Sequence, residues 1–210
     1  AAFEGVYVCT TGGAHCSTTN SSGEYTITGL PTSSYKIEFS PPYGSSYVTQ
    51  YYNGKSSASE ANAVSVTEGV TASNINAEMH EGGRIQGKVT KAVGGGGIED
   101  IDVCAFEAGS GSRCVYSDAS GNYTISGLRA GSYTVEFYAG YGGGNYLTQY
   151  YNAKSTRSEA DSVTVAAEAT TSNINAAMDE GGQIAGKVTK FVGGADLEEL
   201  EVCAYEEGSS

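Results

Sequence analysis

The 210-residue sequence has few positive charges, no tryptophan and no long apolar run. It holds 11 Lys and Arg residues against 24 Asp and Glu residues, which gives a formal net charge of −13. An acidic chain of this kind is a poor partner for nucleic acids and for anionic membrane surfaces. No apolar stretch approaches the roughly 18 residues that a membrane-spanning helix needs. Because the chain begins at Ala1 with no signal-peptide pattern, we expect a mature or excised segment whose targeting sequence lies outside it.

Helical periodicity is also absent, and short clusters of β-branched and aromatic residues alternate with Gly-, Ser- and Asn-rich turns. In the stretch SYTVEF, Tyr133, Val135 and Phe137 fall on one face of an extended chain, and Glu136 falls on the other. A period of two predicts a strand with one buried and one solvated face.

An internal repeat organises the whole chain. YVTQYYNGKS at Tyr47 returns 99 residues later as YLTQYYNAKS, and EGGRIQGKVTK at Glu81 returns as EGGQIAGKVTK at the same offset. Self-similarity at a fixed period is the mark of a repeat architecture. Within one period we predict strands near residues 84–91, 99–106, 113–117, 122–125, 132–138, 146–151, 162–166 and 172–178. We therefore expect an all-β fold of tandem Ig-like or prealbumin-like β-sandwich modules, each of seven or eight strands and about 99 residues.

The register of the repeat divides the chain into three parts. Residues 1–79 are expected to form a sandwich module that lacks its first strand, and residues 80–178 a complete module. Residues 179–210 would supply the first strands of a third module, completed beyond the segment or by a neighbouring chain.

Five cysteines are an odd number for an oxidising compartment. The repeat pairs Cys9 with Cys16 and Cys104 with Cys114, each as a staple across a hairpin on the outer face of a sheet. Cys203 aligns with Cys104, so its partner is expected near position 213, past the end of the segment. Closing a loop of about ten residues stabilises a fold by roughly 2.5–3 kcal/mol in the chain-entropy model. Disulfides imply an extracellular location.

Catalytic and metal sites find little support in the sequence. It contains no Cys-x-x-Cys, and His15 and His80 have no histidine at the matching position of the other module. The acids Glu99, Asp100 and Asp102 lack the alternating ligand spacing of a calcium loop, so a solvated acidic edge is the simpler interpretation. We expect no enzyme activity, no cofactor and no metal ion.

Two long stretches carry a family resemblance. GRIQGKVTKAVGGGGIEDIDVCAF, from Gly83, and SDASGNYTISGLRAGSYTVEF, from Ser117, resemble the carboxypeptidase regulatory-like or prealbumin-like β-sandwich module. That module is similar in turn to the Cna B-type repeats of secreted bacterial surface proteins. The resemblance covers essentially every residue and implies a spacer, stalk, adhesive or fibre-forming array, although GIEDI and DLEEL carry acids where a Pro is common.

The same resemblance raises the question of a Lys–Asn isopeptide bond, which Cna B-type domains often carry beside a buried acid. The matching lysines are Lys88 or Lys91, the asparagines Asn173 or Asn175, and the acid Glu136. We do not expect the bond, because Glu136 alternates onto the polar face, where a carboxylate keeps its solvation.

Two pairs of adjacent tyrosines are candidate contacts between modules or chains. Tyr51 and Tyr52, like Tyr150 and Tyr151, are neighbours in a strand and point to opposite faces, so at least one of each pair should face out. Exposed tyrosine is favoured at interfaces, although packing under the loop that follows is an alternative.

Two Asn-x-Ser/Thr sequons, at Asn20 and Asn122, are candidate glycosylation sites. They do not align with each other in the repeat, and chance occurrence is the simpler explanation. Glycans stay a candidate partner.

The sequence thus predicts an extracellular structural protein at the cell surface, which forms a fibre, stalk or surface array by end-to-end stacking of modules, with itself as partner. Its rivals are an adhesin that presents loops to a ligand and a spacer of a secreted enzyme.

Two arrangements of such an array remain open. In one, the segment is a slice of a longer continuous chain, and Cys203 bonds within the next module. In the other, residues Gly181–Lys190 insert as a strand into the first module of a neighbour. We favour the continuous chain, because insertion duplicates a strand: Leu197–Glu206 is equivalent to Phe3–Thr10.

Overall fold

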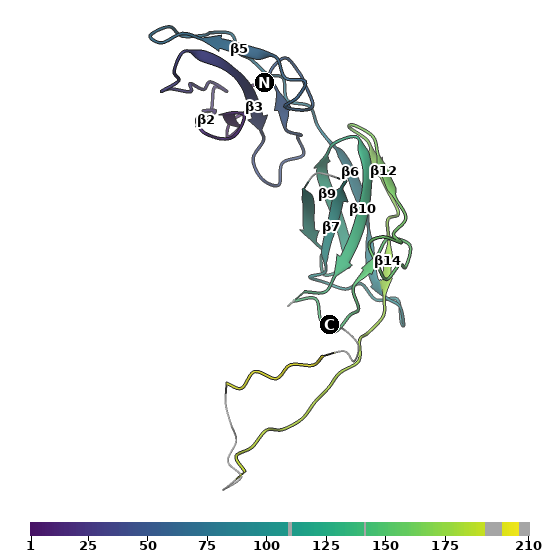
Figure 1. The fold of residues 1–210 in the computed structure, drawn as a ribbon. Helices are drawn as coiled ribbons and strands as arrows, with labels where there is room; N and C mark the ends of the chain where they lie inside the picture. The colour runs from purple at the N-terminus through teal and green to yellow at the C-terminus, as the bar shows by residue number, and fades with distance from the viewer. Residues whose placement is uncertain (109–110, 141, 192–198, 206–210) are drawn as a thin grey trace. The chain divides into compact units, whose positions relative to one another are not determined.

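The computed structural model describes residues 1–108, 111–140, 142–191 and 199–205, and every regular element in these ranges is a β-strand (Figure 1). The predicted all-β fold is confirmed. The chain divides into a compact unit, Ala1–Glu180, and a separate segment, Gly181–Ser210. Within the compact unit we call residues 1–79 the first module and residues 80–178 the second. No helix in the described ranges has the length and apolarity to cross a membrane.

The first module is built on one antiparallel sheet in the order β2-β1-β3-β4, with β5 also paired to β3. Its strands are β1 (Tyr7–Thr10), β2 (Cys16–Thr18), β3 (Ser33–Ser40), β4 (Gln50–Tyr51) and β5 (Ala63–Val66).

The second module is a sandwich of two sheets. One has the order β11-β10-β7-β8 with β12 on β10, and the other has the order β13-β6-β14 with β9 on β6. Strands β13 and β14 run parallel to β6, and β9 runs antiparallel to it. The strands are β6 (Gly83–Lys91), β7 (Asp102–Glu107), β8 (Ser112–Tyr116), β9 (Asn122–Leu128), β10 (Gly131–Tyr138), β11 (Gln149–Tyr150), β12 (Val163–Val165), β13 (Thr170–Thr171) and β14 (Ala176–Met178).

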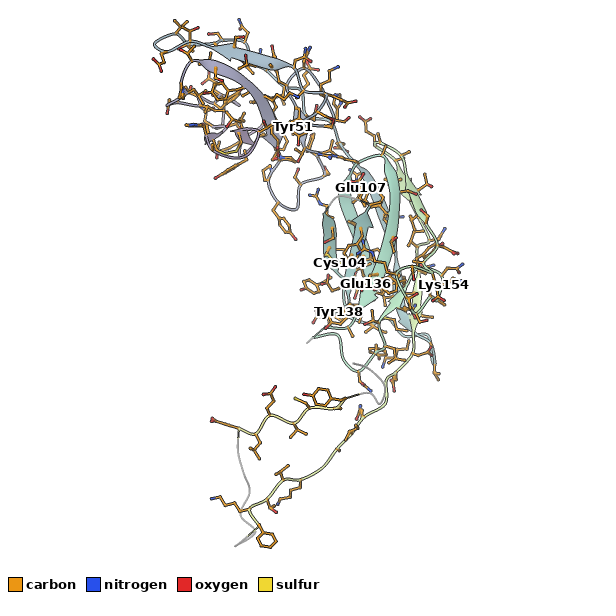
Figure 2. The ribbon with its side chains drawn as sticks, viewed as in Figure 1. Tyr51, Cys104, Glu107, Glu136, Tyr138 and Lys154 are labelled. Atoms are coloured by element: carbon orange, nitrogen blue, oxygen red, sulfur yellow. A yellow bond between two sulfur atoms is a disulfide. The ribbon has the colours of Figure 1, made fainter. Side chains whose placement is uncertain are left out.

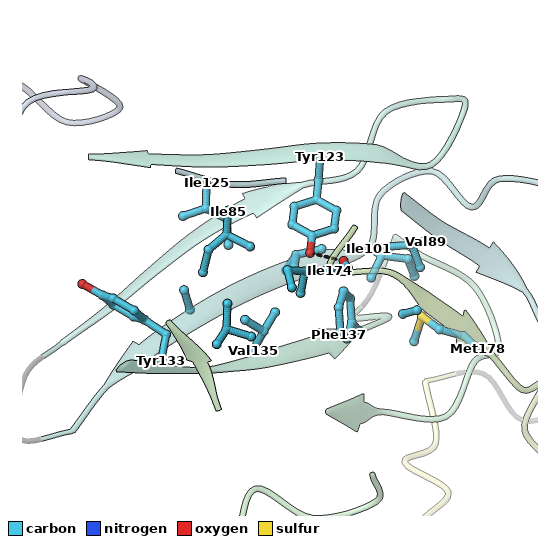
Figure 3. Close-up of a cluster of buried hydrophobic side chains, with 14 of the residues drawn as sticks. Ile85, Val89, Ile101, Tyr123, Ile125, Tyr133, Val135, Phe137, Ile174 and Met178 are labelled. Atoms are coloured by element: carbon cyan, nitrogen blue, oxygen red, sulfur yellow. Dashed lines mark hydrogen bonds between the residues drawn. The ribbon is translucent and has the colours of Figure 1, made fainter. Parts of the chain in front are cut away.

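The core of the second module lies between these two sheets (Figure 3). Tyr133, Val135 and Phe137 reach inward from β10, and Tyr123 and Ile125 face them from β9. The rings of Tyr123 and Phe137 meet edge to face with centroids 6.0 Å apart. The alternation read from SYTVEF is therefore the alternation that fills the core.

Several predicted strands have different bounds in the structure, and the one expected at residues 122–125 extends to Leu128. The strand expected at residues 99–106 begins only at Asp102, because Asp100 has a left-handed backbone with φ 59°. The strand expected at residues 172–178 is divided into β13 and β14 by Asn173, whose φ is 65°. A left-handed residue reverses the pleat and ends strand pairing. The strand expected at residues 146–151 is reduced to Gln149–Tyr150.

Residues 24–30 and 70–79 of the first module, the counterparts of β9 and of β13–β14, carry no assigned strand. In the second module β6 is the strand that pairs with all three of these elements. Tyr25 still donates a hydrogen bond of 2.6 Å to the Ile75 carbonyl, as Tyr123 does to Ile174. The hydrophobic cluster of this module, around Val8 and Phe39, has fewer fully buried members than that of the second module.

The segment Gly181–Ser210 has no assigned strand in its described residues. Its apolar side chains are exposed, with Ile184 at 89% and Val202 at 78% of their full accessibility. Cys203 is a free, exposed thiol. The predicted equivalence of Leu197–Glu206 to Phe3–Thr10 lies partly outside the described residues.

Candidate functional site

Each module carries one disulfide across its first hairpin. Cys9 and Cys16 are register partners on β1 and β2, and Cys104 and Cys114 are register partners on β7 and β8. The Cα atoms are 4.1 Å apart in both pairs. These are the pairs that the repeat predicts, and in each hairpin the bond fixes the register of the outermost strand.

Beside each disulfide lies a glutamate that is paired with a tyrosine. In the second module Glu136 of β10 lies beside Cys104 of β7 (Figure 2), and Tyr150 of β11 is its register partner on the other side. The Tyr150 hydroxyl donates a 2.7 Å hydrogen bond to Glu136 Oε1, and this bond, with partial burial and the carboxylate charge, raises the pKa of Tyr150. Glu38 and Tyr51 are the register pair at the same place in the first module.

The environment of Tyr51 resembles that of Tyr150. Burial raises the pKa of Tyr51 first, and the charge and hydrogen bond of Glu38 raise it further, against a smaller opposing effect of Arg129. The Tyr–Glu pair is thus a repeated feature of the outer face, and it holds the short strands β4 and β11 against β3 and β10.

The next outward side chains in the second module, two residues farther along β10, are more exposed. Asp102 lies between Tyr138 of β10 and Tyr116 of β8, which are 48% and 69% exposed. Burial, and then the charge of Glu136, raise the pKa of Asp102. The acid and the two phenols form a polar and aromatic patch on the outer face of the sheet.

One group of potential metal ligands occurs in the described part of the chain. The ligand atoms of Asp102, Cys104 and Cys114 lie within 4.8 Å of one another. The two sulfur atoms are bonded to each other, so neither offers the thiolate that a metal ion requires. This group is a disulfide beside an acid.

The four candidate interface tyrosines separate into two kinds. Tyr52 and Tyr151 turn inward and pack against the cores of their modules, whereas Tyr51 and Tyr150 lie on the outer face with their glutamates. The opposite orientation within each pair follows from the strand pleat. A contact of Tyr51 or Tyr150 with another module or chain stays a prediction.

The two sequon asparagines lie in equivalent turns but at different positions. Oδ1 of Asn20 accepts hydrogen bonds of 2.9 Å from two backbone N–H groups of its turn, including that of Glu24. Asp118 does the same in the second module at 2.8 Å, with the N–H of Asn122 as one donor. These hydrogen bonds lower the pKa of Asp118. Asn20 and Asn122 are both exposed, and their glycosylation stays a prediction.

The asparagine and lysine positions raised by the isopeptide question are at the surface. Lys88 and Asn175 are exposed, and it is the backbone N–H of Lys88 that donates a 2.8 Å hydrogen bond to Asn175 Oδ1. Glu136 lies on the other sheet of the sandwich.

One backbone hydrogen bond recurs in the two modules. It joins the YVTQYYN or YLTQYYN stretch to the residue before the Glu-Gly-Gly of the next repeat. The N–H of Val48 donates to the His80 carbonyl at 3.1 Å, and the N–H of Leu147 donates to the Asp179 carbonyl at 2.9 Å. Val48 and Leu147 are 99 positions apart in the sequence, and so are His80 and Asp179. Each module therefore holds the residues that lead into the strand that follows it.

An arginine that the sequence did not single out joins residues of the two modules. Arg113 of β8 donates 2.8 and 2.9 Å hydrogen bonds to the carbonyls of Ser45 and Gly127. Partial burial lowers the pKa of its guanidinium. Its counterpart in the first module is His15. The repeat alignment shows this difference, but only the fold shows which carbonyls Arg113 binds.

The fold and these repeated features define a class of protein, a tandem β-sandwich repeat protein with one hairpin disulfide in each module. Residues 84–179 match the carboxypeptidase regulatory-like domain. This match spans the second module, where it confirms the resemblance predicted from the sequence.

Curated relatives and solved structures add a narrower comparison. The serine-aspartate repeat-containing protein F of Staphylococcus epidermidis is 30% identical in an alignment of 135 residues, which covers 57% of this chain and 8% of that protein. The chain thus spans about 8% of the length of this relative.

Three solved structures are similar at lower identity. The Streptococcal ancillary pilin has a TM-score of 0.41 and 13% identity over 86% of this chain and 59% of its own. The TIE protein of Bacillus anthracis gives 0.37 and 16% over 85% of this chain and 31% of its own. A minor pilin of Streptococcus agalactiae gives 0.38 and 12% over 90% of this chain and 88% of its own.

Proposed function

We propose that this protein is an extracellular structural repeat protein at the cell surface, in which stacked modules form a fibre, stalk or surface array. The observation that carries the proposal is the repeated junction, in which Val48 binds His80 and Leu147 binds Asp179 through the same backbone hydrogen bond. Each module binds the residues that lead into the next module. When this contact repeats from module to module, the array extends in one direction. Such contacts add up along the chain and give a linear array when the rotation between units does not close.

Two further features support a role outside the cell. The hairpin disulfides persist in an oxidising compartment, and each one stabilises its module by linking two neighbouring strands. The similarity to the serine-aspartate repeat-containing protein F of Staphylococcus epidermidis, in an alignment of 135 residues, supports a role as a repeat protein. We expect the partner to be a further module or a second copy of the chain.

Electron microscopy of the native material tests this function. We expect filaments or a regular layer whose axial repeat is that of one or two modules. Isolated, unconnected particles at the concentrations found on the cell would contradict an array. A denaturing gel run with reductant then reports whether the array is made of one very long polypeptide or of units near 21.6 kDa.

A binding function is the alternative that one observation favours. Tyr116, Tyr138 and Asp102 expose two phenols and an acid on one face, a composition that suits a polar ligand or a protein partner. Replacing both tyrosines with serine should abolish adhesion to host glycans or proteins if this face binds them. An unchanged filament with lost adhesion would assign the face to binding and leave the array intact.

A further inference from the structure

The loop between β11 and β12 carries an arginine at one end of the outer face of the second module. The guanidinium carbon of Arg157 lies 4.0 Å from the centroid of the Phe106 ring on β7. Next to this contact is an open hollow of about 520 Å³, whose lining includes Phe106, Ser132, Thr134, Arg157, Ser158 and Ser162. This volume lies within the range of roughly 300–1,000 Å³ that is typical of small-ligand sites.

The guanidinium of Arg157 has its donors available to a ligand. Among the described residues it has no hydrogen-bond or ion-pair partner, and its contact is the ring of Phe106. The acid of the same loop, Glu159, accepts a 2.9 Å hydrogen bond from the Thr156 hydroxyl instead. A guanidinium held over an aromatic ring keeps the N–H groups at its edge free, and their fork matches the two oxygens of a carboxylate.

Hydroxyl groups line the other side of the hollow. Ser132 Oγ and Ser162 Oγ are 2.6 Å apart, so one of them donates to the other. The hydroxyl that accepts keeps its own hydrogen, and both oxygens keep lone pairs. Thr134, the register partner of Phe106, adds a third hydroxyl. Groups that both donate and accept suit a ligand that carries hydroxyls itself.

The first module has other residues at the positions that form this hollow. They are Thr11 for Phe106, Lys36 for Thr134 and Ala58 for Arg157. Lys36 Nζ donates hydrogen bonds of 2.6 and 3.0 Å to the carbonyls of Ala58 and Ser59, so its charge holds the loop of its own module. In the second module the positive charge lies on the loop, and no lysine holds the loop from β10. The repeat thus departs from its own pattern where the hollow occurs.

The charge around the hollow favours a ligand with a single acidic group. Glu107 follows Phe106 in the chain, Glu159 lies two residues after Arg157, and the whole chain has a net charge of −13. These charges repel a polyanion. One carboxylate can still pair with the one guanidinium at the hollow.

We propose that this hollow binds a sugar that carries one carboxylate, of the uronic or sialic acid class. Arg157 binds the carboxylate through two N–H groups, and Ser132, Ser162 and Thr134 bind hydroxyls of the sugar. The site is independent of the proposed array, and it gives the second module a binding role that the first module lacks. It lies at the opposite end of β7 from Asp102 and its two exposed tyrosines.

Titration of the full chain, followed by nuclear magnetic resonance, tests the site. The probes are glucuronic acid and N-acetylneuraminic acid, and glucose is the neutral counterpart of glucuronic acid. We expect saturable shifts at the backbone amides of Ser132, Arg157 and Ser158. The affinity for glucose should be at least about tenfold lower, because the charge-assisted pair is lost. Absence of a saturable shift with either acid up to about 10 mM would overturn the proposal, as would equal affinity for glucose.

Three variants locate the binding. Arg157→Ala introduces the residue of the first module and should weaken binding of the acidic sugars at least about tenfold. Thr134→Lys introduces the lysine of the first module, which should reach the loop carbonyls and abolish binding although it adds a positive charge. Lys88→Ala is the control, since it removes the same charge at an exposed position on the other sheet and should leave the affinity within about twofold.

Each contrary result has a definite meaning. Binding that survives Arg157→Ala or Thr134→Lys would overturn the site. An equal loss in Lys88→Ala would show general attraction of anions to the surface and would overturn it as well. A short glutamate peptide that binds as tightly as the acidic sugars, with the same dependence on Arg157, would overturn the assignment to a sugar.

Discussion

The backbone of several individual residues has the left-handed conformation at matching places in the two modules. Gly54 and Ala153 occupy the same turn with φ of 67° and 56°, and Gly69 and Glu168 share another with φ of 75° and 57°. The repeat thus shows which turns tolerate a side chain where the geometry prefers glycine. Alanine in this region costs about 1–2 kcal/mol relative to its ordinary conformation.

Ala153→Gly should therefore stabilise the second module. Glycine removes the strain of the left-handed alanine, but it costs about 0.5–1 kcal/mol because the unfolded chain gains conformational freedom. Since the strain is larger, we expect the free energy of unfolding to rise by about 0.5–1 kcal/mol. Urea unfolding measures it. Ala177→Gly, at an exposed strand position, is the control and should destabilise by a similar amount. A loss of stability in Ala153→Gly would contradict the strain argument.

The buried phenol of Tyr123 provides a second test at this scale. Its hydroxyl donates to the Ile174 carbonyl, and burial raises its pKa. Tyr123→Phe leaves that carbonyl without its donor and should lower the free energy of unfolding by about 1–2 kcal/mol. Tyr25→Phe is the matched change in the first module, where the half-buried site admits water and the loss should be smaller. Equal losses in thermal or chemical unfolding would show that burial does not set the difference.

At the scale of elements, the turn between β8 and β9 is held by one side chain. Asp118 accepts the N–H groups of Ser120 and Asn122, and those hydrogen bonds lower its pKa. A carboxyl whose folded pKa is depressed contributes stability above its unfolded pKa of about 3.9, and that stability is lost as the pH falls through the folded pKa. The sequence aligned this residue with Asn20, but only the hydrogen bonds show that both perform the same task.

Asp118→Asn should accordingly remove part of the acid sensitivity of the second module. The amide oxygen keeps both hydrogen bonds, as Asn20 does, but it does not titrate. We expect the urea midpoint of the variant to fall less than that of the unaltered protein between pH 5 and the acid range. Parallel pH profiles for the two proteins would exclude Asp118 as the titrating group.

The observed strands show how much of the strand pairing the residue pattern predicted. Periodicity located β6, β8 and β10 within a residue or two, because alternation is a local property of the extended chain. It overestimated the strands around Tyr146 and Asn173, since a left-handed residue or a short edge contact is decided by which strand lies alongside. At least one tyrosine of each adjacent pair was expected at the surface, but the pattern did not say which one, and the glutamate partners of Tyr51 and Tyr150 come from a neighbouring strand.

At the scale of the whole molecule, the Arg113 side chain binds a residue of each module. It donates to Ser45, 68 positions earlier, and to Gly127 of its own module. Arg113→Ala should lower the free energy of unfolding of the full chain by about 1–2 kcal/mol, because two carbonyls lose a charged donor. Calorimetry of the intact chain measures the change. His15→Ala at the matching position of the first module should stay within about 0.5 kcal/mol, and a comparable loss there would contradict a special role for Arg113.

The sequence by itself determined the repeat, the all-β class, the strands of strict alternation, the paired hairpin cysteines and the opposite orientation of the two tyrosines in each pair. These depend on repeat register and on the period of the strand, which are both local. Only the tertiary structure decided that Asp118 caps a turn and that Arg113 binds distant carbonyls. These contacts join residues far apart in the chain, and their partners are backbone atoms, which every residue has and no sequence pattern marks.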